Sequence, residues 1–116
     1  MPYPDKIIEI KTIAEETGLI SAYDHFAEGE SPEPPFLLYL FPSTDYFSAD
    51  GIPYNKKSIV HFELYTDTKN PDLETAIETV LEKHSLFYRK SEVWIPDEKL
   101  YEVLYETEVL LCATTK

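Results

Sequence analysis

The sequence predicts an α+β domain in which two helices pack on one face of an antiparallel sheet of about four to five strands. Two segments, about 5–17 and 71–85, have helical apolar spacing, and a long hairpin over 36–66 has strand alternation. Two more strand-like segments follow the second helix. A chain of 116 residues is long enough for one core, so we expect a single domain over 1–116.

The amino-terminal quarter predicts the first helix and a short edge strand. The apolar stripe of the helix recurs at helical spacing and consists of Ile7, Ile10, Ala14 and Thr17, widened by Ile8 and Ile13. Gly18 is typical of the residue that follows a helix end. Residues 19–26 alternate loosely and predict the edge strand, and the Gly-, Pro- and Glu-rich residues 27–35 predict a loop.

The central hairpin is predicted from a turn signal and two matching strands. A two-residue turn at Asp50-Gly51 favours one register, because a shift by one residue would turn His61 and Glu63 toward the core. In that register apolar residues face one another on one side of the sheet: Leu37 and Leu64, Tyr39 and Phe62, Phe41 and Val60. The same face then carries Phe47 opposite Tyr54 and Asp45 opposite Lys56.

The far end of this hairpin is predicted to project beyond the sheet over Thr44 to Lys57. Pro42 and Pro53 have no amide hydrogen for the ladder, so we expect bends or bulges there. A projecting tip with aromatic and basic side chains suits a partner's groove. The candidate interface residues are Tyr46, Phe47, Tyr54, Lys56 and Lys57. The alternative is that the tip folds back and buries these rings in its own domain.

The second helix has a complete start signal, with Asn70 as cap, Pro71 in the first position, and Asp72 and Glu74 in the first turn. Its predicted buried stripe consists of Leu73, Ala76, Ile77, Val80, Leu81 and His84. The strands that follow are joined by a turn at 96–99. On the last strand, the residues predicted to face the core are Tyr101, Val103, Tyr105, Val109 and Leu111, and those predicted to face outward are Glu102, Glu106 and Glu108.

The charge of the chain limits its partners. Ten basic residues against 22 acidic ones give a net charge of −12, which argues against a nucleic-acid binder. Ordinary solubility, a surface that must not hold DNA, and mimicry of DNA all stay open. No apolar run is long enough for a membrane span and no signal peptide is recognisable. We therefore expect that the protein is made in the cytoplasm and does not associate with a membrane. A lone Cys112 excludes an internal disulfide.

The catalytic and metal-binding patterns that the sequence contains are too incomplete to predict an enzyme or a cofactor. His61 and Glu63 lie two apart on one strand face, but no third ligand stands at a supporting spacing. Pro71-Asp72 followed by Asp97-Glu98-Lys99 imitates a metal-dependent nuclease pattern. Such a site needs its acids to converge on one metal ion, whereas these segments are predicted to begin a helix and to form a turn. We therefore expect no catalytic, cofactor-binding or metal-ligating residues.

Most of the chain, from about Gly18 to Leu111, resembles a family of short proteins from tailed bacteriophages and prophages. The similarity rests on the run AYDHF…PPFLLYL…DYFSADGIPYNK…HFELYTDTK…LE…YRKSEVWIPDEKLYEVLYE. Members of this family are tail-completion, tail-terminator or head-tail joining components. The resemblance carries no catalytic signature, since it depends on aromatic and acidic residues.

The resemblance implies a structural virion protein of a long-tailed, non-contractile phage, made in the host cytoplasm and located in the tail or neck. It implies a ring, commonly a hexamer, that contacts tail-tube and head-connector proteins and lets DNA pass without binding it. Glu102, Glu106 and Glu108 are the candidate lumen acids, because carboxylates repel phosphate; a solvated face or pairing with Arg89 is their alternative. The competing hypothesis is an acidic DNA mimic that inhibits a host nuclease or DNA-binding protein.

Overall fold

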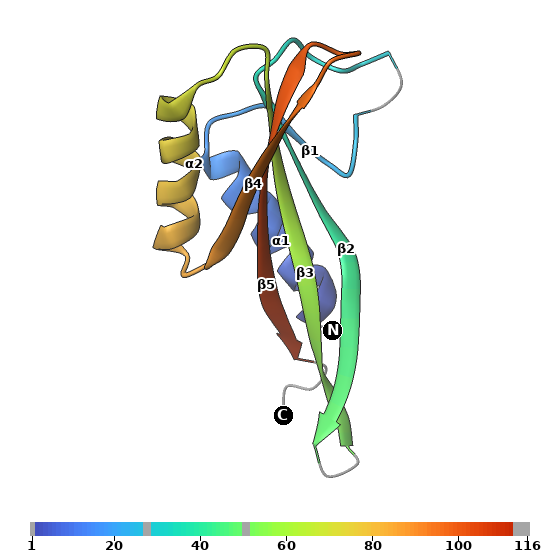
Figure 1. The fold of residues 1–116 in the computed structure, drawn as a ribbon. Helices are drawn as coiled ribbons and strands as arrows, with labels where there is room; N and C mark the ends of the chain where they lie inside the picture. The colour runs from blue at the N-terminus through green and yellow to red at the C-terminus, as the bar shows by residue number, and fades with distance from the viewer. Residues whose placement is uncertain (1, 27–28, 50–51, 113–116) are drawn as a thin grey trace.

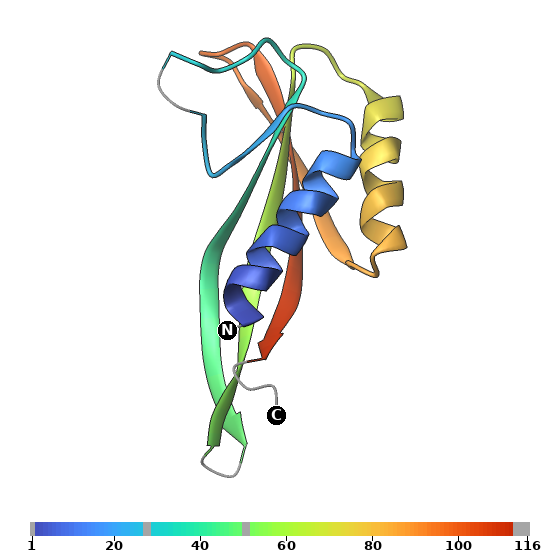
Figure 2. The ribbon, with the colours of Figure 1, turned by 180° about the vertical axis from the view of Figure 1, so that it is seen from behind.

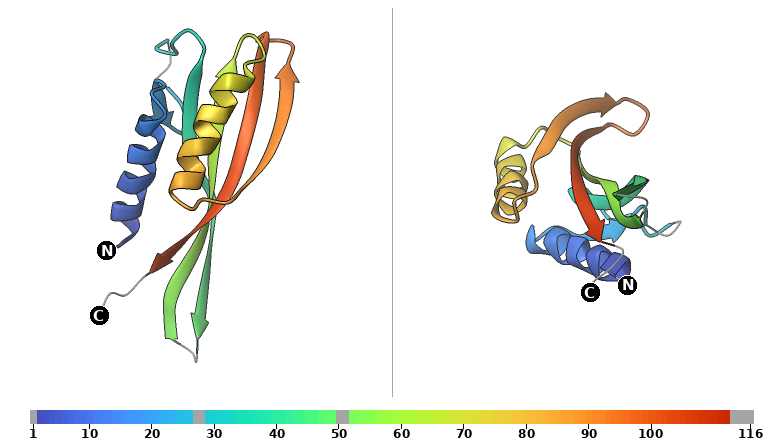
Figure 3. Two further views of the ribbon diagram at one scale, coloured as in Figure 1. Left: turned by 90° about the vertical axis from the view of Figure 1, so that its left-hand side faces the viewer. Right: turned by 90° about the horizontal axis from the view of Figure 1, so that it is seen from below.

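One five-stranded sheet runs the length of the molecule, with both helices on the same side of it (Figures 1 and 3). The computed structural model describes residues 2–26, 29–49 and 52–112, and the side chains of these except 2–6, 46–49, 52–56 and 110–112. The elements are α1 (Pro2–Glu16), β1 (Ser21–Tyr23), β2 (Phe36–Ala49), β3 (Ile52–Thr66), α2 (Pro71–Lys83), β4 (Tyr88–Ile95) and β5 (Leu100–Cys112). The α+β prediction is confirmed.

The order of the strands is β1-β2-β3-β5-β4, and all neighbours are antiparallel except β1 and β2. The edge strand predicted within 19–26 is present, but it runs parallel to β2, with Ser21 opposite Leu37. The sheet is therefore mixed rather than purely antiparallel. The parallel direction is possible because the chain crosses over between Tyr23 and Phe36 instead of turning back in a hairpin.

The register of the β2–β3 hairpin agrees with the prediction where the strands enter the core. Leu37 lies opposite Leu64 and Tyr39 opposite Phe62. At the other end Ala49 lies opposite Ile52, as a two-residue connection requires, although Asp50 and Gly51 themselves lie outside the described residues.

Two irregularities interrupt this register, and each contains one of the two prolines. Between Leu40 and Ser43 the β2 strand has one residue more than β3, and between Phe47 and Ala49 it has one fewer. Pro42 lies in the first interval, and Pro53 lies in the matching interval of β3. The predicted bulges are confirmed, and their opposite senses cancel.

Between the two bulges the predicted pairs are wrong by one residue. Asp45 lies opposite Lys57 rather than Lys56, and Phe47 lies opposite Asn55 rather than Tyr54. The single residue opposite the first bulge is Val60, so Phe41 shares that position with Pro42 instead of facing Val60 alone. The physical reason is that an extra residue in one strand displaces every pair beyond it.

The core lies between the helices and the sheet face that they cover. Its members are the apolar residues of that face and of the two helices: Ile10, Ile13, Ala14, Leu37, Tyr39, Val60, Phe62, Leu64, Ile77, Leu81, Leu86, Val103, Tyr105 and Val109. Ser58 is also fully buried on this face, and its hydroxyl donates to the Ser43 carbonyl at 3.1 Å, just past the first bulge.

Both helices begin and end with the expected local signals, although their limits differ slightly from the prediction. The Asn70 side chain accepts a hydrogen bond from the Leu73 amide at 3.1 Å, which confirms the cap of α2. Gly18 follows α1 with φ +83°, a conformation that favours glycine. In α2, Ala76 is exposed and Glu74 is buried, so the predicted stripe is rotated toward Glu74.

The carboxyl ends of the two helices are joined by one acidic side chain. Glu16 of α1 accepts hydrogen bonds from Lys83 and, at 2.8 Å, from the His84 ring. These two bonds hold the pKa of the Glu16 carboxyl below its ordinary value, and the bond from Lys83 has the larger effect. Figure 2 shows α1 lying obliquely across the sheet, with its carboxyl end near α2.

Candidate interaction surfaces

The distal hairpin, defined here as residues 44–57, reaches further than any other part of the molecule (Figure 1). The molecule measures 50 × 29 × 23 Å along its principal axes. β5 accompanies β3 as far as Asn55, which lies opposite Cys112. The part with only two strands is therefore shorter than the predicted projection from Thr44 to Lys57.

The candidate interface residues all lie in the paired strands of the distal hairpin. Tyr46 lies opposite Lys56, and Phe47 opposite Asn55, while Tyr54 falls in the second bulge. The side chains of Tyr46, Phe47, Tyr54 and Lys56 lie outside the described residues. The fifth candidate, Lys57, is exposed. No described element other than β5 pairs with this part of the hairpin, since β1 pairs only with Leu37–Tyr39.

The sheet face turned away from the helices, called here the open face, carries the three candidate lumen acids. Glu102, Glu106 and Glu108 alternate along β5 with the buried Val103, Tyr105 and Thr107, so the prediction that these acids face away from the core is confirmed. The side chain of Leu111, which was predicted to face the core, lies outside the described residues. Glu102 is half-buried, whereas the Glu106 and Glu108 side chains are 36% and 55% exposed. Because β5 lies between β3 and β4, Glu106 has a neighbour on each side: His61 of β3 and Arg89 of β4.

His61 occupies the centre of the open face between two carboxylates. Its Nδ1 lies 3.9 Å from Glu63 and its Nε2 lies 3.8 Å from Glu106. Burial raises the pKa of the Glu63 carboxyl, although the Tyr65 hydroxyl donates to it at 3.0 Å. Among the described residues, no three histidine, cysteine or acidic side chains are placed to hold a metal ion. The two acids of the nuclease-like pattern lie where the sequence predicted them: Asp72 is in the first turn of α2, and Asp97 is in the turn between β4 and β5.

A groove of about 470 Å³ lies where β4 begins, on the side of β5 that β4 leaves uncovered. It is lined by Ile59, Phe87, Arg89, Glu106 and Glu108, among others. The Thr107 hydroxyl donates to the Phe87 carbonyl at 2.7 Å, and the Phe87 side chain is left 85% exposed. The sequence did not reveal this groove, because it depends on β5 continuing past Thr107, the residue opposite which β4 begins.

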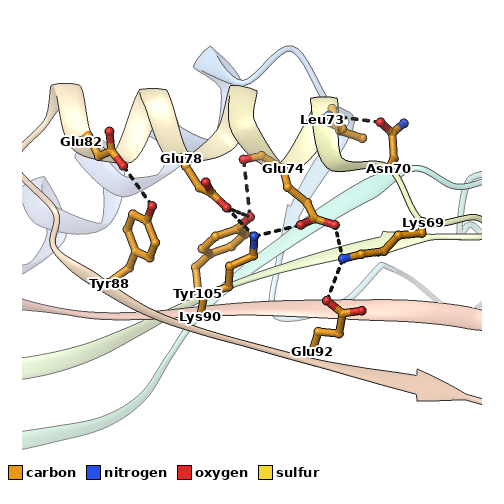
Figure 4. Close-up of polar contacts among 10 residues, drawn as sticks. All are labelled: Lys69, Asn70, Leu73, Glu74, Glu78, Glu82, Tyr88, Lys90, Glu92 and Tyr105. Carbon is orange, nitrogen blue, oxygen red and sulfur yellow. Dashed lines mark hydrogen bonds and ion pairs between the residues drawn. The ribbon is translucent and has the colours of Figure 1, made fainter.

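A buried glutamate fixes α2 to the sheet (Figure 4). Glu74, whose side chain is 6% exposed, accepts from Lys69 at 2.6 Å and pairs with Lys90 at 2.9 Å. Lys69 also binds Glu92 at 2.7 Å, and Lys90 binds Glu78 at 2.7 Å. Burial alone would raise the pKa of Glu74, but the two lysines outweigh it and the pKa lies below its ordinary value.

Two tyrosines complete the contact between α2 and the sheet. The Tyr105 hydroxyl donates to Glu78 at 2.8 Å, and the Tyr88 hydroxyl donates to Glu82 at 2.9 Å. Burial, followed by the bond to Glu82, raises the pKa of Tyr88 to about 12. This cluster has the geometry of a structural contact, since each charged group already has a protein partner.

No helix of the described residues is long and apolar enough to cross a membrane. A scan against protein-family models finds no match for this chain, and no curated protein matches it significantly.

Proposed function

We propose that this protein is a structural component of a bacteriophage or prophage tail, which completes the tail tube, joins it to the head and acts as part of a ring. The observation that carries the proposal is the distal hairpin, which extends beyond the core and both helices (Figures 1 and 2). Beyond Asn55, where the pairing with β5 ends, the hairpin has only two strands. Isolated two-stranded hairpins are at best marginally stable in water, so this end gains most from contact with another subunit.

The charge distribution supports the same role. The row of Glu102, Glu106 and Glu108 gives the open face an acidic stripe. Facing a channel, such a stripe would repel DNA phosphates and let the DNA slide. In this role the protein takes part in assembly rather than catalysis. Its partners are the tail-tube protein and the head connector, and it is located in the virion.

Electron microscopy of tails assembled with and without the protein tests this proposal. We expect tails made without it to lose control of tube length or to fail to join heads. Complementation with Phe47→Ser/Tyr54→Ser should restore little, whereas the control Val93→Ser, at a position that is 51% exposed on β4, should restore normal tails. Circular dichroism must show the double variant folded. Tails of unchanged length and normal joining without the protein would refute the role.

The acidic stripe also favours the second candidate, a DNA mimic that inhibits a host nuclease or DNA-binding protein. Mimicry needs carboxylates spaced like phosphates on an exposed face, but the stripe is interrupted by the half-buried Leu104 and flanked by Arg89 and His61. Measuring the mass of the protein in solution with and without the tail-tube protein separates the candidates. A monomer that ignores the tube protein but binds a nuclease would favour mimicry.

A further inference from the structure

The strand β4 leaves one whole edge of the sheet unpaired. It is the last strand in the order β1-β2-β3-β5-β4, so β5 pairs with one of its edges and no described strand pairs with the other. Figure 3 shows β4 at the margin of the sheet. Residues 89–94 of this eight-residue strand are all exposed. An unpaired strand of this length is a template for pairing with a strand of another chain.

The charged side chains of β4 do not protect this edge. Charges on an edge strand usually prevent association, but Lys90 and Glu92 are drawn toward α2 and the segment before it (Figure 4). Lys90 binds Glu74 and Glu78, and Glu92 binds Lys69. Each of the two side chains is nevertheless 36% exposed, so both still meet whatever lies beside the strand.

The exposed apolar surface of the described residues is concentrated at the same edge. Three of the six large hydrophobic residues that are exposed lie within 87–95: Phe87 is 85% exposed, Val93 51% and Trp94 43%. They lie on both sides of the sheet. Val93 is opposite Glu102 of the open face, whereas the Trp94 ring contacts the Tyr101 ring on the helix side, with 4.7 Å between their centroids. A partner that covers both sides must therefore lie alongside β4, in the plane of the sheet.

The sequence of β4 fits a second copy of itself in one register. In a symmetric antiparallel pair the two-fold axis is perpendicular to the sheet, so residues that face the helices lie opposite residues that also face the helices. Each such register places one residue opposite its own copy. Lys90 or Glu92 at the axis would oppose like charges, which is destabilising. Ser91 at the axis avoids this and pairs the whole of residues 87–95.

The pairs that this register creates are complementary on both sides of the sheet. On the helix side, Lys90 lies opposite Glu92 of the partner subunit, and Tyr88 lies opposite Trp94 of the partner subunit. On the open face, Phe87 lies opposite Ile95 of the partner subunit. Cross-strand pairs of opposite charge and of aromatic or β-branched residues stabilise a sheet, and buried aromatic side chains are frequent anchors of interfaces.

We propose that the protein forms a two-fold symmetric dimer through the free edge of β4, with Ser91 on the axis. The two five-stranded sheets then join into one continuous sheet, and the distal hairpins of the two copies point in opposite directions. Both copies use the same edge, so the contact closes at two copies and cannot continue around a ring. The inference therefore goes beyond the proposed function and concerns the free chain.

Charges placed on the axis test this contact. Ser91→Lys and Ser91→Glu each set two like charges opposite each other, whereas a mixture of the two variants sets opposite charges there. Analytical ultracentrifugation and native mass spectrometry should show the wild-type chain in a concentration-dependent equilibrium between 13.4 kDa and twice that mass. Each variant alone should dimerise at least about tenfold more weakly, because like charges meet at the axis. The mixture should recover a dimer that contains one copy of each variant.

The single tryptophan of the chain gives an independent measurement. Trp94 is 43% exposed and lies opposite Tyr88 of the partner subunit in the proposed dimer. Its fluorescence emission should shift to shorter wavelength as the wild-type concentration rises through the range of dimerisation. Ser91→Lys should show no shift over the same range. A dimer formed through another surface would leave the emission of Trp94 unchanged.

Matched controls separate the edge of β4 from a general effect of charge. Thr12→Lys and Thr12→Glu make the corresponding changes at an exposed position on α1 and should dimerise like the wild type, alone or mixed. Circular dichroism must show the Ser91 variants folded. If one of them is not, the Trp94 emission of the wild type decides the question.

A wild-type chain that stays monomeric up to its solubility limit overturns the inference. So does an assembly of any size that folded Ser91 variants leave unchanged, a mixture that forms no mixed dimer, or a constant Trp94 emission. None of these results bears on tails assembled with and without the protein, so the proposed function stands or falls separately.

Discussion

The proximal and distal parts of the β2–β3 hairpin share one backbone pairing but differ in what lies across them. In the proximal part Val60, Phe62 and Leu64 are at most 1% exposed beneath the helices. Past the first bulge, residues 43–45 of β2 and Lys57 of β3 are exposed. Strand alternation alone therefore does not create a core. Its energetic value depends on a second layer of structure, and where that layer ends the same strands become a surface.

The largest effect should come from the proximal part. Phe62→Ala removes a ring that is 1% exposed, and we expect a loss of about 3–5 kcal/mol in the free energy of unfolding, because the cavity adds to the lost burial. Urea denaturation measures it. The matched change Phe87→Ala, at 85% exposure, should alter the free energy by less than about 0.5 kcal/mol. Equal losses at the two sites would contradict the division into a core and a surface.

An intermediate effect is expected at Glu74, which holds α2 over the proximal part. Removing its charge by Glu74→Gln leaves Lys69 and Lys90 with their other partners, Glu92 and Glu78. The Lys69 and Lys90 side chains are 40% and 36% exposed, so solvent screens both pairs. We expect a loss of about 1 kcal/mol at pH 7, below the usual range for bonds to charged groups because solvent screens these pairs.

The pH dependence gives this prediction its sign. Since the pKa of Glu74 is held below its ordinary value of 4.5, its contribution is present above that pH and disappears as the pH falls through the lowered value. The stability difference between wild type and Glu74→Gln should therefore be full at pH 7 and should shrink as the pH falls below 4.5. The control Asp67→Asn, at an exposed position, should show little difference at either pH. A difference that persists at low pH would show that Glu74 acts through packing rather than charge.

The proximal part was predictable from sequence and the distal part only in outline, for a physical reason. Apolar residues on both strands fix the register, because a slip by one residue would expose Phe62 and Leu64 and bury His61. Proline marked both bulges, since it cannot donate to the ladder. In both bulges the extra residue lies in the strand that carries the proline, but the predicted register took no account of an extra residue, so the pairs of Asp45 and Phe47 were displaced by one.

The other differences come from contacts between segments far apart in the chain. Glu74 is buried because Lys69 and Lys90 converge on it, and Lys90 belongs to a strand that the helix sequence does not specify. The parallel direction of β1 depends on a crossover rather than on local pattern. The groove exists because β4 begins opposite Thr107 while β5 continues to Cys112, a difference in length that only the folded sheet reveals.

The smallest effect on stability should come from Lys57 in the distal hairpin. Its ion pair with Glu108 is 3.9 Å long, and the two side chains are 48% and 55% exposed. Exposed pairs of this kind contribute little, so Lys57→Ala should change the free energy of unfolding by less than about 0.5 kcal/mol. Thermal unfolding measures this, with Lys11→Ala, which breaks the exposed pair with Glu15, as the matched control. A loss well above 1 kcal/mol at Lys57 alone would mean that the distal hairpin supports its own domain.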